Sequence, residues 1–155
     1  MQLCDIFLSL GEERLGSLLR SISIGRLKTY QLYERLKTRL HVPKLNTDAL
    51  RRAASRSWQR LNERDEEFAT DLAQSILVSH LDMIRDVLNY LEIPNEDGFF
   101  AKDLDASSLL KEGWQQNAFE QFRNKYPEPL VLFYINHLAW EVQKADQVFA
   151  PATGA

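Results

Sequence analysis

The chain has 155 residues, the length of one ordinary domain, and its 45% hydrophobic and 26% charged residues exclude a disordered, collagen-like or disulfide-rich protein. The single cysteine, Cys4, excludes an intramolecular disulfide or a cysteine-based zinc site and favours the reducing cytoplasm. The net charge of −3 combines two opposed halves. Residues 1–62 hold 12 Lys or Arg against 5 Asp or Glu, and residues 63–155 hold 7 against 17.

Nothing in the hydropathy of the chain indicates a membrane protein. No basic stretch precedes the apolar residues at the N-terminus, so we expect no secretory signal. The longest nearly apolar stretch, residues 130–140, falls far short of the roughly 20 residues that span a bilayer. We therefore expect a cytoplasmic protein without a membrane partner.

Three helices are predicted in the basic half. Leucines at helical spacing predict a short helix over residues 12–22, and a second over about 29–40 must end before Pro43. A third is predicted over residues 47–63, because an apolar pattern follows a capping residue and an acidic first turn. Its apolar side is formed by Leu50, Ala53, Ala54, Ser57, Trp58 and Leu61.

The acidic half predicts three further helices. Helical spacing continues from Asp65 to Leu91 as one segment of about 27 residues, and a break near Asn62 is left open. After a turn at residues 95–98, Asp105, Ser107 or Ser108 starts a helix to about Tyr126, and prolines at 127 and 129 start a last helix to about Phe149. The rival interpretation of residues 130–135 as a strand leaves that strand without a pairing partner.

These elements predict an all-α, single-domain bundle of about six helices over residues 1–149. Within it, residues 12–63 form a basic three-helix subunit and residues 64–149 an acidic helical part. Residues 150–155 are expected to form a disordered tail.

A row of arginines is the most specific local pattern. Arg52, Arg56, Arg60 and Arg64 recur every four residues, with Arg51 beside them, so they line one face of the 47–63 helix. Like charges at this spacing destabilise an isolated helix, so a compensating partner is expected. The basic residues of the preceding segment, which extend the face, are Lys28, Arg35, Lys37, Arg39 and Lys44.

The arginine face supports several interpretations. The charge segregation is explained by pairing between the basic half and the acidic half of the same fold or of a second copy, or by an acidic protein partner. The alternative is a helix-turn-helix-type nucleic-acid binder through residues 12–63, with Arg51, Ser55, Arg56 and Gln59 facing the groove. We favour a protein-interaction or regulatory module over nucleic acid, because the acidic half would repel the same phosphates.

Other kinds of site find little support in the sequence. The sequence contains no nucleophile elbow, P-loop or dinucleotide-binding turn. Its histidines also lack the spacing of a di-iron bundle. We therefore predict no catalytic residue, metal or cofactor and favour a non-enzymatic role. A second alternative, a bundle that encloses a small apolar ligand, rests on aromatic residues whose helical spacing otherwise indicates core packing. These are Trp114, Phe119, Phe122, Tyr126, Phe133, Tyr134 and Trp140.

Overall fold

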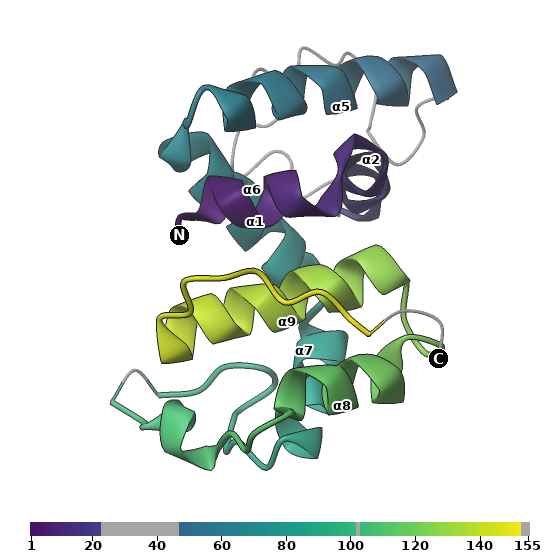
Figure 1. Cartoon of the computed structure of the whole chain (residues 1–155). Coiled ribbons are helices and arrows are strands. Elements are labelled where there is room, and N and C mark those ends of the chain that lie inside the picture. The colour runs from purple at the N-terminus through teal and green to yellow at the C-terminus, as the bar shows by residue number, and fades with distance from the viewer. Residues whose placement is uncertain (23–46, 102, 153–155) are drawn as a thin grey trace. The chain divides into compact units, whose positions relative to one another are not determined.

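A computed structural model describes residues 1–22, 47–101 and 103–152. These residues form an all-α fold, as the sequence predicts, and contain no strand beyond one isolated bridge (Figure 1). The helices are α1 (Leu3–Leu10), α2 (Glu12–Ser21), α5 (Thr47–Asn62), α6 (Glu66–Ser79), α7 (Leu81–Tyr90), the short 3-10 helix η2 (Ala106–Leu109), α8 (Trp114–Phe122) and α9 (Glu128–Gln143). The helix expected over residues 29–40, with Arg35 and Arg39, lies outside the described residues.

The chain divides into two compact units. The N-terminal unit runs from Gln2 to Ser79, and the C-terminal unit comprises Met1 and the residues from His80 onward. The border lies at the junction of α6 and α7, beyond the point where the charge changes sign. That residues 1–149 act as a single domain stays a prediction.

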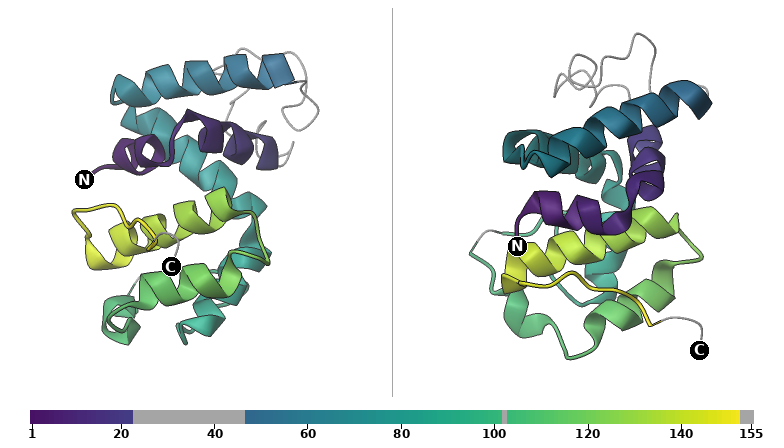
Figure 2. Two further views of the ribbon diagram at one scale, coloured as in Figure 1. Left: turned by 45° about the vertical axis from the view of Figure 1, so that its right-hand side comes forward. Right: turned by 45° about the horizontal axis from the view of Figure 1, so that its top comes forward.

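Four helices make up the described part of the N-terminal unit. α5 lies across α2 and α1, and α6 packs against the same pair (Figure 2). α2 and α5 confirm the helices predicted over 12–22 and 47–63. The sequence did not predict α1, which begins where the Gln2 amide donates to the Asp5 carboxylate at 2.9 Å. Five of its eight residues are buried: Leu3, Cys4, Ile6, Phe7 and Leu10.

The sequence left open whether the helix is continuous through Asn62, and the structure shows a break there. α5 ends at Asn62, and Arg64 takes a left-handed conformation with φ of 62°. Asp65 then caps α6, because its carboxylate accepts the Phe68 amide hydrogen at 3.0 Å. α5 and α6 are therefore separate helices joined by a tight turn.

The predicted continuous helix from Asp65 to Leu91 is wrong, because the backbone leaves the helical region at His80 (φ −133°, ψ 42°). The last turn of α6 shows the physical reason. The Ser75 and Ser79 hydroxyls donate to the carbonyls of Asp71 and Ser75, each at 2.7 Å. Such bonds compete with the backbone ladder and bend helices. The apolar spacing continues past this point because α6 and α7 each bury an apolar face.

The turn predicted at residues 95–98 is confirmed as a tight hairpin. The Glu96 and Phe99 backbones exchange hydrogen bonds of 2.7 and 3.0 Å. Asp97 and Gly98 between them have φ of 51° and 93°, the pair of positive angles that an Asp-Gly turn supplies. A Cβ on Gly98 would lie 3.1 Å from the Leu81 carbonyl oxygen, so this hairpin fits closely against the start of α7.

The helix predicted from Asp105, Ser107 or Ser108 to Tyr126 is also wrong. Asp105 caps only η2, through the Ser108 amide at 3.3 Å, and α8 starts afresh at Trp114. Gly113, placed inside the predicted helix, has φ of 79° and precedes α8 as its N-cap. Glycine reaches this left-handed conformation without steric cost, so it separates the two elements.

α9 begins at the predicted prolines, and residues 130–135 are helical and not a strand. Every residue from Leu130 to Ala139 is buried. The prediction that this helix continues to Phe149 is wrong, because Lys144 is left-handed (φ 53°) and ends it. Residues 145–152, which we call the strap, continue without helix or strand. Of the predicted tail, Ala152 is held by a hydrogen bond from its amide to the Gln116 side chain at 2.9 Å.

Candidate partner-binding face

The inner side of α5 fixes the direction of its arginines. Ala53, Ala54, Ser57 and Leu61 are buried, and the Ser57 hydroxyl donates back to the Ala53 carbonyl at 3.0 Å. Gly16 of α2 brings the two backbones close, since a Cβ there would lie 3.7 Å from that of Ala54. Because these small residues seat α5 on α2, the opposite side of the helix faces solvent.

The arginine row is divided between two environments. At its C-terminal end, Arg60 pairs with Asp65 at 3.2 Å and lies 5.5 Å from the centre of the Phe68 ring. Arg64 pairs with Asp5 of α1, and this hydrogen bond holds the pKa of the Asp5 carboxyl below its usual value. For Arg60 and Arg64, the compensation expected for the like charges therefore comes from carboxylates of the same unit.

Arg51 and Arg52, at the N-terminal end of the row, face solvent. Arg51 and Arg52 are exposed and form no hydrogen bond or ion pair with any residue that the structure describes, and Arg56 is half-buried. Ser55, next to them, donates to Glu12 of α2 at 2.7 Å, and Gln59 donates to Glu63 at 3.2 Å. Of the predicted site residues, the structure thus places Arg51, Arg52 and Arg56 together and assigns Arg60 to the α5–α6 turn. Arg35 and Arg39 lie outside the described ranges.

The charges of the two units remain opposed. The sequence from Gln2 to Ser79 holds 13 Lys or Arg against 10 Asp or Glu, and the sequence from His80 onward holds 6 against 12. The basic surplus of the N-terminal unit is smaller than that of residues 1–62, because α6 and the turn before it add carboxylates. The exposed arginines of α5 are therefore a local basic feature on a nearly balanced unit.

A pocket of about 290 Å³ lies in the C-terminal unit, between the end of α7 and the start of α8. Its wall combines rings and leucines with polar groups: Tyr90, Leu91, Glu92, Leu109, Lys111, Trp114 and Asn117. The Trp114 indole is fixed by donating to Gln143 at 3.2 Å. Glu92, Lys111 and Asn117 form no side-chain hydrogen bond or ion pair within the described part of the chain. Of the aromatic residues singled out in the sequence, only Trp114 lines this pocket.

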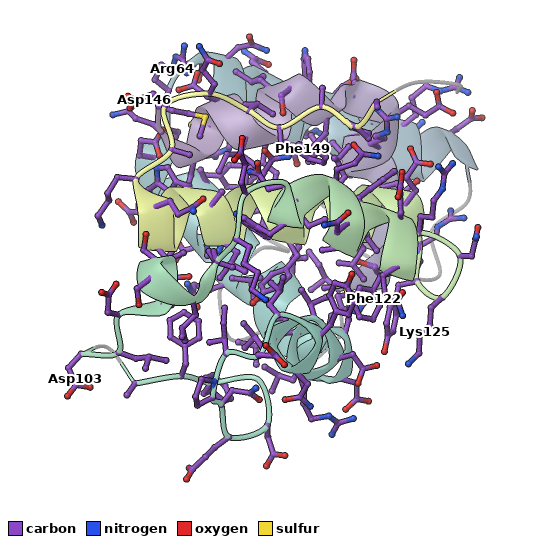
Figure 3. All side chains as sticks on the ribbon, turned by 60° about the horizontal axis from the view of Figure 1, so that its bottom comes forward. Arg64, Asp103, Phe122, Lys125, Asp146 and Phe149 are labelled. Carbon is purple, nitrogen blue, oxygen red and sulfur yellow. The ribbon has the colours of Figure 1, made fainter. Side chains whose placement is uncertain are left out.

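The other aromatic residues of that set behave as core or near-core residues. Phe119, Phe122, Phe133 and Tyr134 are all buried. Tyr126 is half-buried and donates to Asp86 of α7, which Lys125 also contacts at 2.9 Å. Figure 3 shows Lys125 near Phe122, the last residue of α8. Burial and this hydrogen bond raise the pKa of Tyr126 to about 12. The contacts of Lys125 and Tyr126 with Asp86 connect α7 to the residues after α8.

Two titratable groups to which the sequence assigned no functional role, Cys4 and His137, are buried. Burial raises the pKa of the Cys4 thiol to about 12, which leaves it protonated and unreactive at neutral pH. Burial lowers the pKa of His137 to about 4. The His137 Nδ1 lies 3.6 Å from the Glu141 carboxylate, but a neutral imidazole forms no ion pair, so His137 is uncharged at pH 7. Neither burial could be read from spacing alone.

In the described ranges, no three His, Cys, Asp or Glu side chains come close enough to hold a metal ion. No described helix is long and apolar enough to cross a membrane. Comparison with protein-family models, with curated proteins and with solved structures found no match for this chain.

Proposed function

We propose that this chain is a binding module that presents Arg51 and Arg52 of α5 to an acidic surface of a protein partner. The observation that carries the proposal is the division of the arginine row. Arg60 and Arg64 are paired inside their own unit, whereas Arg51 and Arg52 are exposed on a helix whose other side is fixed by packing. Guanidinium groups form charge-assisted, bidentate hydrogen bonds to carboxylates, and they lose less side-chain entropy per hydrogen bond than a lysine ammonium does.

Two arginines give modest affinity by themselves. Exposed charge pairs contribute about 0.2–1 kcal/mol each, and at 0.1 M salt the attraction between charges more than about 10 Å apart is largely screened. Such a face therefore steers and orients a partner, and the binding should weaken as salt rises. The acidic surplus from His80 onward makes a second copy of this chain another candidate partner.

The test compares binding of two labelled probes by fluorescence anisotropy between 50 and 200 mM salt. The probes are a 20-residue poly-glutamate peptide and a 20-base-pair DNA duplex. The variant is Arg51→Glu/Arg52→Glu, and its control, Lys111→Glu/Lys144→Glu, makes the same charge change at exposed lysines of the C-terminal unit. Arg60 is left intact because its loss would disturb the turn that Asp65 caps.

The proposal predicts that the wild type and the control bind poly-glutamate in a salt-dependent way and that the arginine variant binds about tenfold more weakly. Stronger binding of the duplex, with a steep salt dependence lost in the arginine variant, would replace this proposal with the nucleic-acid alternative. Equal affinity of the arginine variant and the control for both probes would refute either use of this face. Analytical ultracentrifugation of the same samples would show whether the partner is a second copy.

The pocket beside Trp114 supports a second candidate function, the binding of a small ligand. Because Glu92, Lys111 and Asn117 accompany the aromatic wall, the pocket suits a ring compound with a polar group better than a purely apolar one. Benzoate should raise the melting temperature of the wild type and not of Lys111→Ala. An equal shift in both proteins, or no shift in either, would remove this candidate.

A further inference from the structure

The strap, residues 145–152, lies along α9 and reaches α8 without forming a helix or strand of its own (Figure 1). It starts where left-handed Lys144 turns the chain back from the end of α9. Figure 3 labels Phe149 on this segment. The hydrogen bonds that hold its outer half come from side chains of α8 and α9.

Asn136 is the main anchor of the strap. It lies in the middle of α9, is 1% exposed, and is with His137 one of two buried polar residues in the run 130–139. Its side-chain oxygen accepts the Phe149 amide hydrogen at 2.6 Å, and its nitrogen donates to the Phe149 carbonyl at 3.3 Å and to the Leu132 carbonyl at 3.0 Å. One side-chain amide thus binds both backbone groups of a single strap residue.

Two further contacts complete the attachment. The Phe149 ring meets the buried Phe119 ring edge-on, with centroids 6.4 Å apart. Gln116, three residues earlier on α8, accepts the Ala152 amide hydrogen at 2.9 Å. The contact with Phe119 therefore requires an aromatic side chain on the strap, whereas the hydrogen bonds to Asn136 and Gln116 use only backbone groups of the strap.

We propose that Asn136, Gln116 and Phe119 form a peptide-binding site, which the strap fills as an internal ligand and which an aromatic-bearing peptide segment of a partner protein takes by displacing it. Backbone groups are the same in every peptide, so any unfolded segment with an aromatic residue at the position of Phe149 can satisfy these contacts. Val148 and Phe149 are only half-buried, so the strap is not part of the closed core. This proposal does not depend on the arginine face of α5.

Because Asn136 is buried, the strap leaves its site favourably only when another peptide replaces it. If the strap left without a replacement, a buried amide would lose two of its hydrogen bonds, which is unfavourable. The strap also competes at the high effective concentration that its covalent link gives. A partner peptide should therefore bind the wild type weakly and bind tightly once the strap is weakened.

The test uses the full chain and a fluorescein-labelled peptide with the sequence of residues 145–152, Ala-Asp-Gln-Val-Phe-Ala-Pro-Ala. Phe149→Ala weakens the strap and leaves the site intact. Ala152→Pro removes the amide that Gln116 binds, at an exposed position, and serves as a second weakened strap should Phe149→Ala fail to fold. The matched control for the site is Phe149→Ala/Gln116→Ala, and the control probe carries Ala in place of Phe.

We expect Phe149→Ala or Ala152→Pro to bind the labelled peptide at least about tenfold more tightly than the wild type does, because each removes a contact of the competing strap. Binding should weaken with the control probe and in the Gln116→Ala double variant. Equal affinity of the wild type and both strap variants for the peptide would overturn the proposal. A dimer of the wild type that dissociates in Phe149→Ala would also overturn it, because the site would then accept the strap of a second copy.

Discussion

We expect the unfolding free energy of the C-terminal unit to fall by about 2 kcal/mol between pH 7 and pH 5 because of His137. Burial lowers its pKa to about 4 in the folded chain, against the ordinary histidine value of 6.5 that holds when the chain is unfolded. Between these values the unfolded state binds the proton and the folded state does not. The stability is therefore complete above about pH 6.5 and is lost as the pH falls toward 4. At pH 5 the difference in protonation amounts to about 2 kcal/mol.

Of the described groups whose pKa is shifted, only His137 loses stability as the pH falls from 7 to 5. The pKa values of Asp5 and Asp86 are lowered from 3.8, so their contributions are lost only below about pH 4. Glu141, the carboxylate beside His137, has a raised pKa because of burial, so acid favours its folded state and acts in the opposite direction. Repeating the measurement in Glu141→Gln removes this opposing contribution.

The assay is urea unfolding followed by tryptophan fluorescence at pH 7, 6 and 5, with His137→Gln as the matched variant that cannot take up a proton. The wild type should lose stability over this range, and His137→Gln should change by less than about 0.5 kcal/mol. A parallel decline in both proteins would refute the assignment, because the loss would then come from other groups.

Three further predictions concern separate features of the fold. Asp65→Ala should lower the unfolding free energy by about 1–2 kcal/mol through loss of the cap on the Phe68 amide, and Asp65→Asn, which keeps a capping oxygen, should cost less in the same urea titration. Gly98→Ala should lower the unfolding free energy by about 1–3 kcal/mol, and by more than Gly113→Ala does. Both glycines have positive φ, but only at Gly98 does a backbone oxygen lie 3.1 Å from the new Cβ. Equal losses in the two variants would contradict this explanation. Cys4 should react with a thiol reagent in urea and not in the folded protein, and rapid labelling without denaturant would contradict its burial.

The sequence predicts helices well where their ends carry local signals. The helices predicted over 12–22 and 47–63 have their counterparts in α2 and α5, and the Asp97-Gly98 pair predicts its turn. The predictions failed at Gly113, which was placed inside a helix, and where a helix ends without a local signal, as at His80 and Lys144. There the apolar pattern continues, and only the backbone conformation changes.

For the candidate site, too, the sequence predicts the features that depend on neighbouring residues and not the contacts between distant ones. Four-residue spacing places Arg52, Arg56 and Arg60 along one face of a helix, because helical geometry is local. Which arginine is free depends on distant residues, since Arg64 meets Asp5 across 59 positions of sequence. The strap site is likewise hidden from the sequence, because Asn136 binds backbone groups of Phe149, which any residue type carries.

The attachment of α1 affects how the chain emerges during synthesis. The Cys4 amide donates to Glu66 at 3.2 Å, and Arg64 holds Asp5, so α1 is secured by residues made about 60 positions later. At about 5–20 residues per second, that interval lasts about 3–12 seconds. During this time the apolar side of α1, which includes Ile6 and Phe7, has no complete surface to cover it. α1 is thus made before α5 and α6 but is secured only after both of them have been made.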